Sequence, residues 1–201
     1  MTDSLKPRAA QAADKRRRLT AAAAQVLHEQ GVERTTLADI ARVADVPVGN
    51  VYYYFKTKDE LVRAALSEHT ARLDQLTGRL DRLPDPLDRL KALIEAWVSQ
   101  RDIATRYGCP TGTLAVEVDK RADGTLDAEA GAVIRQLLDW AGHQFRTLGL
   151  PDPEDLAITL VSGYQGMSLL ASALRDPDIM TRQGARLLHW LDSLQAPRRT
   201  P

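Results

Sequence analysis

The sequence has one cysteine among its 201 residues, few aromatic side chains and no net charge. A single cysteine excludes an internal disulfide, and no continuous run approaches the roughly 18 apolar residues of a membrane span. The first residues also lack the apolar stretch of about 7 to 15 residues that a secretory signal contains. We therefore expect a cytoplasmic protein without a membrane segment. The content of 44% hydrophobic and 27% charged residues is typical of a folded chain with one or two domains.

The charges are unevenly distributed along the chain. Residues 1–66 contain 11 basic and 8 acidic side chains, and the remaining residues contain 16 basic and 19 acidic ones. The excess of positive charge lies in Lys15-Arg-Arg-Arg18. A basic cluster at the start of a chain is usually a solvated tail, so it indicates a nucleic-acid partner only if neighbouring residues do the same.

The apolar spacing predicts an all-α protein of about nine helices. Leu19, Ala23, Val26 and Leu27 recur at helical spacing, and Gly31 supplies a left-handed stop. The expected helices, bounded by caps, glycines and prolines, cover residues 14–30, 37–44, 47–54, 58–83, 87–106, 127–148, 155–175 and 178–194. Residues 51–55 and 113–118 have strand propensity, but we assign both to helices because a two-stranded ribbon alone is marginally stable.

Residues 36–55 have the pattern of a helix-turn-helix motif. Thr36 is placed to cap the first helix through the amide of Asp39, and Pro47 suits the start of the second. Over residues 15–62 the chain resembles the DNA-binding domain of the TetR family of bacterial transcriptional regulators. The resemblance rests on Thr36, Asp39-Ile-Ala41, Ala44, Val46, Gly49, Tyr52, Phe55, Lys58 and Leu61. Pro47 stands where that family often has serine, and Tyr54 stands where it often has histidine.

The resemblance implies that the second helix of the motif enters the major groove of operator DNA. Gly49 permits a close approach to the bases, and Asn50 carries both a donor and an acceptor for a base edge. Three consecutive tyrosines on a helix point about 100° apart, so they do not all fit against one small core, and we expect them to contact DNA. The predicted DNA-binding residues are Arg17, Arg18, Thr36, Pro47, Val48, Gly49, Asn50, Tyr52, Tyr53, Tyr54 and Lys58.

The rest of the chain resembles the helical effector and dimerisation domain of the same family. We expect a flexible arm over residues 1–14, the DNA-binding domain over residues 15–62, the effector domain over residues 63–195 and a flexible tail over residues 196–201. The last two helices carry a broad apolar surface, and the family resemblance implies that it is a homodimer interface. The alternative is that the same residues pack inside one subunit. The predicted interface residues are Leu160, Gly163, Gly166, Leu170, Ala171, Leu187 and Leu191.

The aromatic residues of the second domain are candidates for an effector pocket, although aromatic side chains at helical spacing often form core. A mostly apolar small molecule is the expected effector. The predicted lining residues are Trp97, Tyr107, Cys109, Trp140, His143, Tyr164 and Met167. Cys109, in a Gly-Cys-Pro turn, is either an inert buried thiol or a sensor of oxidants or electrophiles.

The sequence thus predicts a ligand-controlled repressor and not an enzyme. The four histidines are scattered, and neither a metal-ligand cluster, a phosphate-binding glycine loop nor a nucleophile with its base is visible, so we expect no cofactor. The expected partners are double-stranded operator DNA, a second copy of the chain and the effector. A redox- or electrophile-sensing repressor acting through Cys109, and a helical protein-interaction module without DNA binding, are the alternatives.

Overall fold

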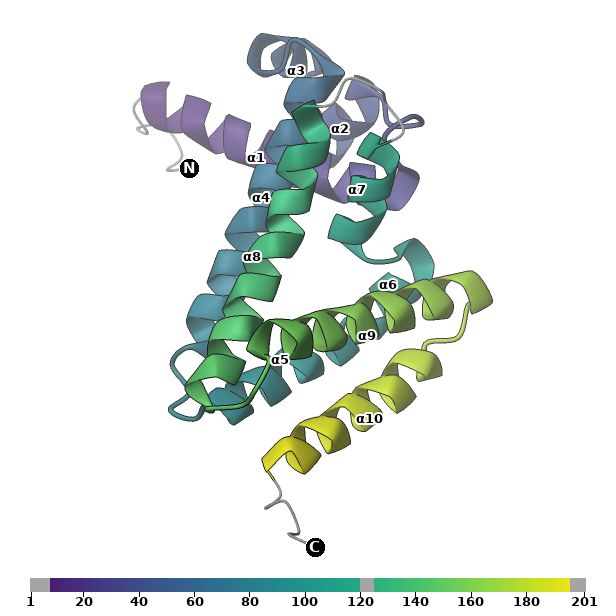
Figure 1. The fold of residues 1–201 in the computed structure, drawn as a ribbon. Helices are drawn as coiled ribbons and strands as arrows, with labels where there is room; N and C mark the ends of the chain where they lie inside the picture. Colours follow the sequence, from purple (N-terminus) through teal and green to yellow (C-terminus); the bar gives the residue numbers. More distant parts are fainter. Residues whose placement is uncertain (1–7, 120–124, 196–201) are drawn as a thin grey trace, which may run out of the picture. The chain divides into compact units, whose positions relative to one another are not determined.

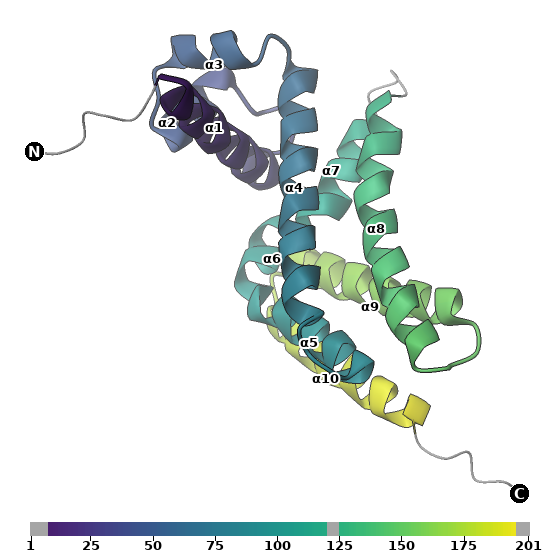
Figure 2. The same ribbon diagram turned by 90° about the vertical axis from the view of Figure 1, so that its left-hand side faces the viewer.

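The computed structural model describes residues 8–119 and 125–195, and these residues form ten α-helices and no strands (Figures 1 and 2). The all-α fold class is therefore confirmed. The helices are α1 (Arg8–Gln30), α2 (Leu37–Ala44), α3 (Val48–Tyr54), α4 (Lys58–Leu80), α5 (Pro86–Ser99), α6 (Arg101–Tyr107), α7 (Pro110–Asp119), α8 (Thr125–Thr147), α9 (Pro153–Leu174) and α10 (Asp178–Gln195).

The chain divides into two compact units. Of the described residues, the first unit contains 8–71 together with 113–119 and 125–130, and the second contains 72–112 together with 131–195. The chain passes from one unit to the other three times, within α4, α7 and α8. The sequence predicts one boundary near residue 62, whereas residues 113–119 and 125–130, which lie in the predicted effector domain, group with the helix-turn-helix region.

The first unit has a small apolar core built from α1 to α4. Its α1 packs against α2, and α2 packs against α3. Each of these helices turns one apolar face inward at helical spacing, which is the pattern that buries a stripe of side chains. The core consists of Leu19, Ala22, Ala23 and Val26 of α1 together with Ile40, Ala41, Ala44, Val51, Phe55 and Leu61.

The second unit is a helical bundle in which α9 packs against α6 and α10, and α10 packs also against α5 (Figure 2). Two glycines allow these helices to approach closely. A Cβ added to Gly184 of α10 would lie 2.4 Å from Cγ2 of Val98 on α5, and one added to Gly163 of α9 would lie 3.0 Å from Cδ2 of Leu187 on α10. In both places the backbone of one helix therefore packs directly against a side chain of its neighbour.

Several helix bounds differ from those expected. Helix α1 begins at Arg8, so residues 8–14 of the predicted flexible arm are helical. The helix expected over residues 87–106 is two helices, because α5 ends at Ser99 and α6 begins at Arg101. Residues 113–118 lie in a helix, as expected, whereas Phe55 is already extended at the end of α3. The predicted tail over residues 196–201, and residues 1–7 of the arm, lie outside the described residues.

Among the described residues, one helix, α9, is long and apolar enough by length and composition to cross a membrane. It has no continuous apolar run, and 33% of the apolar stretch is buried inside the fold. Core helices of water-soluble proteins meet the same criterion, and packing of α9 against α6 and α10 accounts for its buried apolar side chains, whereas Ile158, Leu169, Leu170 and Leu174 are exposed.

Candidate nucleic-acid interface

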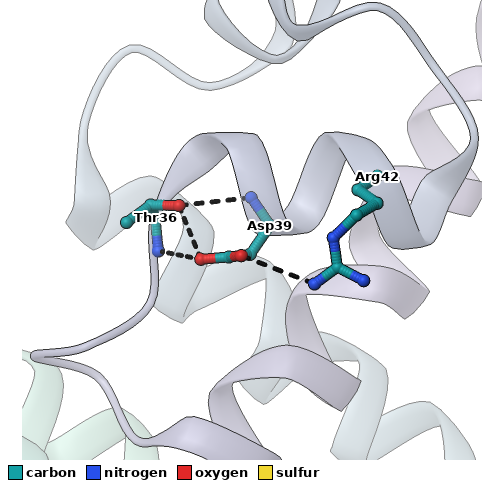
Figure 3. A network of polar contacts seen from close by, with 3 residues as sticks. All are labelled: Thr36, Asp39 and Arg42. Atoms are coloured by element: carbon teal, nitrogen blue, oxygen red, sulfur yellow. Dashed lines mark hydrogen bonds and ion pairs between the residues drawn. The ribbon is translucent and has the colours of Figure 1, made fainter.

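The start of α2 is fixed by a reciprocal pair of hydrogen bonds (Figure 3). The amide of Asp39 donates to Oγ1 of Thr36 at 3.2 Å, and the amide of Thr36 donates to the Asp39 carboxylate at 3.2 Å. The Thr36 hydroxyl also donates to that carboxylate, and Arg42 lies 3.5 Å from it. These bonds with Thr36, together with the nearby Arg42, lower the pKa of Asp39 below its ordinary value. The predicted Thr36 cap is confirmed, and the reciprocal bond from the Thr36 amide makes it a complete capping box.

The turn between α2 and α3 is held by an arginine from α1. Asp45 ends α2 in the left-handed conformation, with φ of 52° and ψ of 54°. The guanidinium of Arg18 donates to the carbonyl oxygen of Asp45 at 2.7 Å and to its carboxylate at 3.0 Å. Arg18, which we predicted to contact DNA, is thus engaged with the turn that sets the direction of α3.

Helix α3 presents its first residues to solvent. Pro47 is the N-cap and makes no side-chain capping bond, which is the consequence expected of a proline at this position. Val48 is 47% exposed, Gly49 has open space where a Cβ would stand, and Asn50 is half-buried. Val51 is fully buried, so one side of the helix faces the core and the other side offers Val48, Gly49 and Asn50 to a partner.

The three consecutive tyrosines are divided between solvent and core. Tyr52 is 57% exposed and Tyr53 is 73% exposed, whereas Tyr54 packs against the core of the first unit. The rings of Tyr53 and Tyr54 meet edge to face, with centroids 5.1 Å apart. The expectation that the tyrosines do not all fit against the core is therefore correct, but the structure makes only Tyr52 and Tyr53 readily available to a partner.

Two lysines follow α3 closely and line a shared hollow. Nζ of Lys58 donates to the carbonyl oxygen of Glu33 at 3.0 Å, and Nζ of Lys56 donates to that of Tyr52 at 2.8 Å. The hollow has a volume of about 250 Å³ and is lined by Leu27, Thr35, Thr36, Leu37, Ile40, Lys56, Thr57, Lys58 and Leu61. Lys56 is not among the residues predicted from the sequence, although its place directly after α3 is a signal that the sequence contains.

Two family models match the chain. One, described as bacterial regulatory proteins of the tetR family, covers residues 19–65, and the other, described as a tetracyclin repressor-like C-terminal domain, covers residues 86–186. The chain belongs to the TetR family. Its helix-turn-helix region is thus the DNA-binding region of a transcriptional regulator, and members of this family are regulators and not enzymes.

Known regulators resemble this TetR-family protein over most of its length or over its N-terminal part. An uncharacterized HTH-type transcriptional regulator of Mycobacterium tuberculosis, Rv0196, is 29% identical over 188 residues, which is 86% of this chain and 93% of that protein. The regulator TtgR of Pseudomonas putida is 39% identical over 71 residues, 32% of this chain and 34% of that protein. A TetR-family regulator from Agrobacterium tumefaciens has the same fold, with a TM-score of 0.78, 21% identity and coverage of 89% of this chain and 98% of that chain.

The structure brings together only part of the predicted effector set. The rings of Trp97 on α5 and Tyr164 on α9 are stacked, with centroids 4.4 Å apart. Tyr164 lies beside Cys109, and the side-chain amide of Gln165 donates to Sγ of Cys109 at 3.5 Å. Burial, and then the neighbouring Cys109, raise the pKa of the Tyr164 phenol well above its ordinary value. Gln165 also belongs to this group, and it is not among the lining residues predicted from the sequence.

The other predicted effector residues are placed elsewhere in the second unit. The indole N–H of Trp140 on α8 donates to the carboxylate of Asp81 at 3.0 Å, and His143 is exposed. These two residues therefore do not join Trp97 and Tyr164, which corrects the prediction of one common lining. Met167 is buried beside a groove between α9 and α10, and Tyr107 is half-buried at the end of α6.

The residues predicted for the dimer interface also divide into two groups. Leu160, Ala171, Leu187 and Leu191 are buried in the core of their own subunit, so they have no surface left to bury against a second copy. This corrects four of the predicted interface residues. Gly163, Gly166 and Leu170 instead line the groove between α9 and α10, which has a volume of about 510 Å³. Among the described residues no cluster of three His, Cys, Asp or Glu side chains is placed to hold a metal ion.

Proposed function

We propose that this TetR-family regulator is a homodimeric, cytoplasmic repressor that binds a palindromic operator and is released by a mostly apolar small molecule. The carrying observation is the exposed face at the start of α3. Val48 and Gly49 approach the bases, and Asn50 reads a base edge. Tyr52 and Tyr53 extend their phenol groups toward phosphates on either side. Thr36, Pro47, Lys58, Arg17 and Arg18 complete the proposed contact set, with Lys56 added from the structure, whereas the half-buried Tyr54 supports Tyr53 through their ring contact.

The dimer is supported by an apolar surface on α9. Ile158, Leu169, Leu170 and Leu174 are each more than half exposed, and the groove between α9 and α10 lies beside Leu170. Leu170 and Leu174 lie one helical turn apart on the same face, and contiguous exposed apolar surface marks an interaction site in soluble proteins. A second copy bound by the same surface gives a two-fold assembly, and a two-fold assembly carries two recognition helices for two half-sites.

The effector site is supported by the group around Trp97, Cys109 and Tyr164. The stacked rings provide a flat apolar wall, and the amide of Gln165 provides a polar group. Ser168 lies one helical turn beyond Tyr164, and its fully buried hydroxyl has no hydrogen-bond partner among the described residues. A ligand with an aromatic ring and one polar atom matches this combination, because it supplies the partner that the Ser168 hydroxyl lacks.

Selection of duplex fragments from a random pool by the purified protein, followed by sequencing, tests the proposed DNA binding. We expect a palindrome with half-sites about one helical turn apart. Asn50→Ala should reduce the preference for the selected sequence, whereas Tyr52→Phe should weaken selected and random duplexes alike. Enrichment of no sequence would contradict the proposal, and equal losses on both duplexes for Asn50→Ala would remove Asn50 from base reading.

A second candidate mode of release is modification of Cys109 by an electrophile. The sulfur accepts hydrogen bonds from the amide of Gly112 at 3.3 Å and from Gln165, and these donors hold it in one place at the start of α7. An activated alkene would form a carbon–sulfur bond, and the thiol proton would pass to the carbon next to the activating group. N-ethylmaleimide should then release operator from the wild-type protein and not from Cys109→Ser. Equal release of both proteins would exclude Cys109 as the sensor.

A further inference from the structure

Helix α7 carries one carboxylate that reaches the turn between α1 and α2. The amide of Val32 donates to Oε2 of Glu117 at 2.5 Å, although the two residues are 85 positions apart in the sequence. Both belong to the first unit. The charge-assisted bond satisfies an amide just beyond the end of α1, and bonds of this kind are stronger than bonds between neutral groups.

Gly31 makes this contact possible in two ways. Its φ is +80°, a conformation that L side chains rarely adopt. A Cβ at this position would also lie 2.9 Å from both carboxylate oxygens of Glu117. A glycine at position 31 is therefore needed for two reasons. It adopts the positive φ of the turn, and it leaves room for the Glu117 carboxylate to reach the backbone.

The turn that Glu117 holds leads directly into the DNA-binding helices. The hydroxyl of Thr35 donates to the carbonyl oxygen of Gly31 at 2.7 Å, and the next residue, Thr36, caps α2. Val32 itself is buried, with 1% of its surface exposed. Because α2 packs against α3, the place of the turn sets the place of the recognition helix.

The other end of the same helix is bound to a different group. Helix α7 begins at Pro110, directly after Cys109, and the amide of Gly112 in its first turn donates to Sγ of Cys109. Glu117 is the eighth residue of this ten-residue helix. Helix α7 therefore connects the residues beside Cys109 with the residue that holds the α1–α2 turn.

We propose that Glu117 is a positioning residue that holds the α1–α2 turn in the geometry that binds operator. Operator affinity then depends on where α7 places this carboxylate. The inference rests on the proposed function for its DNA partner, but the contact itself has a readout that needs no DNA, the exchange of the Val32 amide proton with solvent.

The test compares three variants with the wild-type protein in operator affinity at fixed salt, in melting temperature and in exchange of the Val32 amide. Glu117→Ala should weaken binding to the selected operator by about tenfold and accelerate exchange of the Val32 amide, because a hydrogen bond to a charged group no longer favours the held position of the turn. Glu117→Gln keeps an acceptor oxygen and should show a smaller loss. Glu129→Gln, which removes the exposed partner of Arg63 in the same unit, is the matched control and should bind as the wild type does.

Wild-type operator affinity in Glu117→Ala, or a tighter complex, would overturn the inference. A loss of affinity that accompanies an equal loss of binding to random duplexes and a broad fall in melting temperature would also overturn it, since this describes a damaged core and not a displaced turn. Should Glu117→Ala fail to fold, Glu117→Gln decides: unchanged operator affinity together with faster exchange of the Val32 amide would contradict the proposal.

Gly31→Ala tests the same contact from the other side. Its Cβ pushes against the carboxylate, so it should also weaken operator binding, and the double variant with Glu117→Ala should lose less than the combined losses of the two single variants. Additive losses would show that the two residues act independently and would refute the inference. A wild-type protein that binds no duplex at all would contradict the proposed function, whereas slow wild-type exchange at Val32 that Glu117→Ala accelerates would still establish the contact.

Discussion

Lys56 offers a quantitative test of the phosphate contacts, because its ammonium group lies at the exposed end of the recognition helix. Its Nζ bonds the carbonyl oxygen of Tyr52 and lies 5.7 Å from the ring centre of Tyr53. Lys56→Gln keeps a donor for that carbonyl and removes the charge. Each phosphate neutralised by a lysine contributes about 0.9 to the slope of log affinity against log salt.

A dimer loses two such contacts, so the slope should become shallower by about 1.8 in Lys56→Gln. When salt rises fourfold, from about 50 to 200 mM, the affinity of both proteins falls. The factor by which it falls should be about 12 times smaller for the variant than for the wild-type protein. Fluorescence anisotropy of a labelled operator duplex across this salt range measures both slopes. The expected change applies to random duplexes as well, since phosphates carry no sequence information.

Lys91→Gln is the matched control for the loss of one positive charge per subunit. Lys91 lies in the second unit and forms an ion pair with Asp192 at 2.5 Å. Lys91→Gln should leave the slope of log affinity against log salt unchanged. A Lys56→Gln slope equal to that of the wild-type protein would refute the assignment of Lys56 to a phosphate, and an equal change in both variants would show that overall charge and not contact governs the salt dependence.

Three other outcomes test the packing, the dimer and the cap of α2. Gly184→Ala should destabilise the protein by about 1–3 kcal/mol in urea unfolding, because its Cβ would overlap Val98, whereas Gly166→Ala, which has open space, should not. Leu170→Arg should give monomers by sedimentation velocity; a persistent dimer would place the interface elsewhere. Because the pKa of Asp39 is lowered in the folded state, its carboxylate stabilises the fold at pH values above the ordinary pKa of 3.8. This contribution should be lost as the pH falls through the lower folded-state pKa. The free energy of unfolding of Asp39→Asn, measured at several acidic pH values, should therefore change less with pH than that of the wild-type protein.

The helix-turn-helix could be predicted closely because its signals are local. Thr36 and Asp39 are three residues apart, and Pro47 stands one residue before α3, so the caps appear directly in the sequence. The contacts that hold the motif in place could not be predicted. Arg18 reaches Asp45 across 27 residues and Glu117 reaches Val32 across 85, and neither pairing leaves a periodic pattern.

The second unit was predicted less well because helical spacing shows which residues share a face but not what that face contacts. Trp140 and His143 lie one turn apart, which fits a common pocket, yet the Trp140 indole contacts Asp81 and His143 is exposed. The apolar residues of α9 and α10 were likewise predicted at an interface, whereas Leu160 and Leu191 fill the core of the subunit itself. Only the tertiary arrangement decides between these environments.

The arginines of the first unit bear on how the protein separates its operator from the rest of a chromosome. Arg17 pairs with Asp14, Arg18 with Asp45 and Arg42 with Asp39, so part of the positive charge that the sequence offers to phosphates is balanced within the protein. Charge attracts any duplex, whereas a tyrosine hydroxyl or an amide needs its acceptor in one place. We therefore expect this surface to attract duplex DNA of any sequence only weakly, and to remain bound for long only where the groove places acceptors opposite its tyrosine hydroxyls and amide.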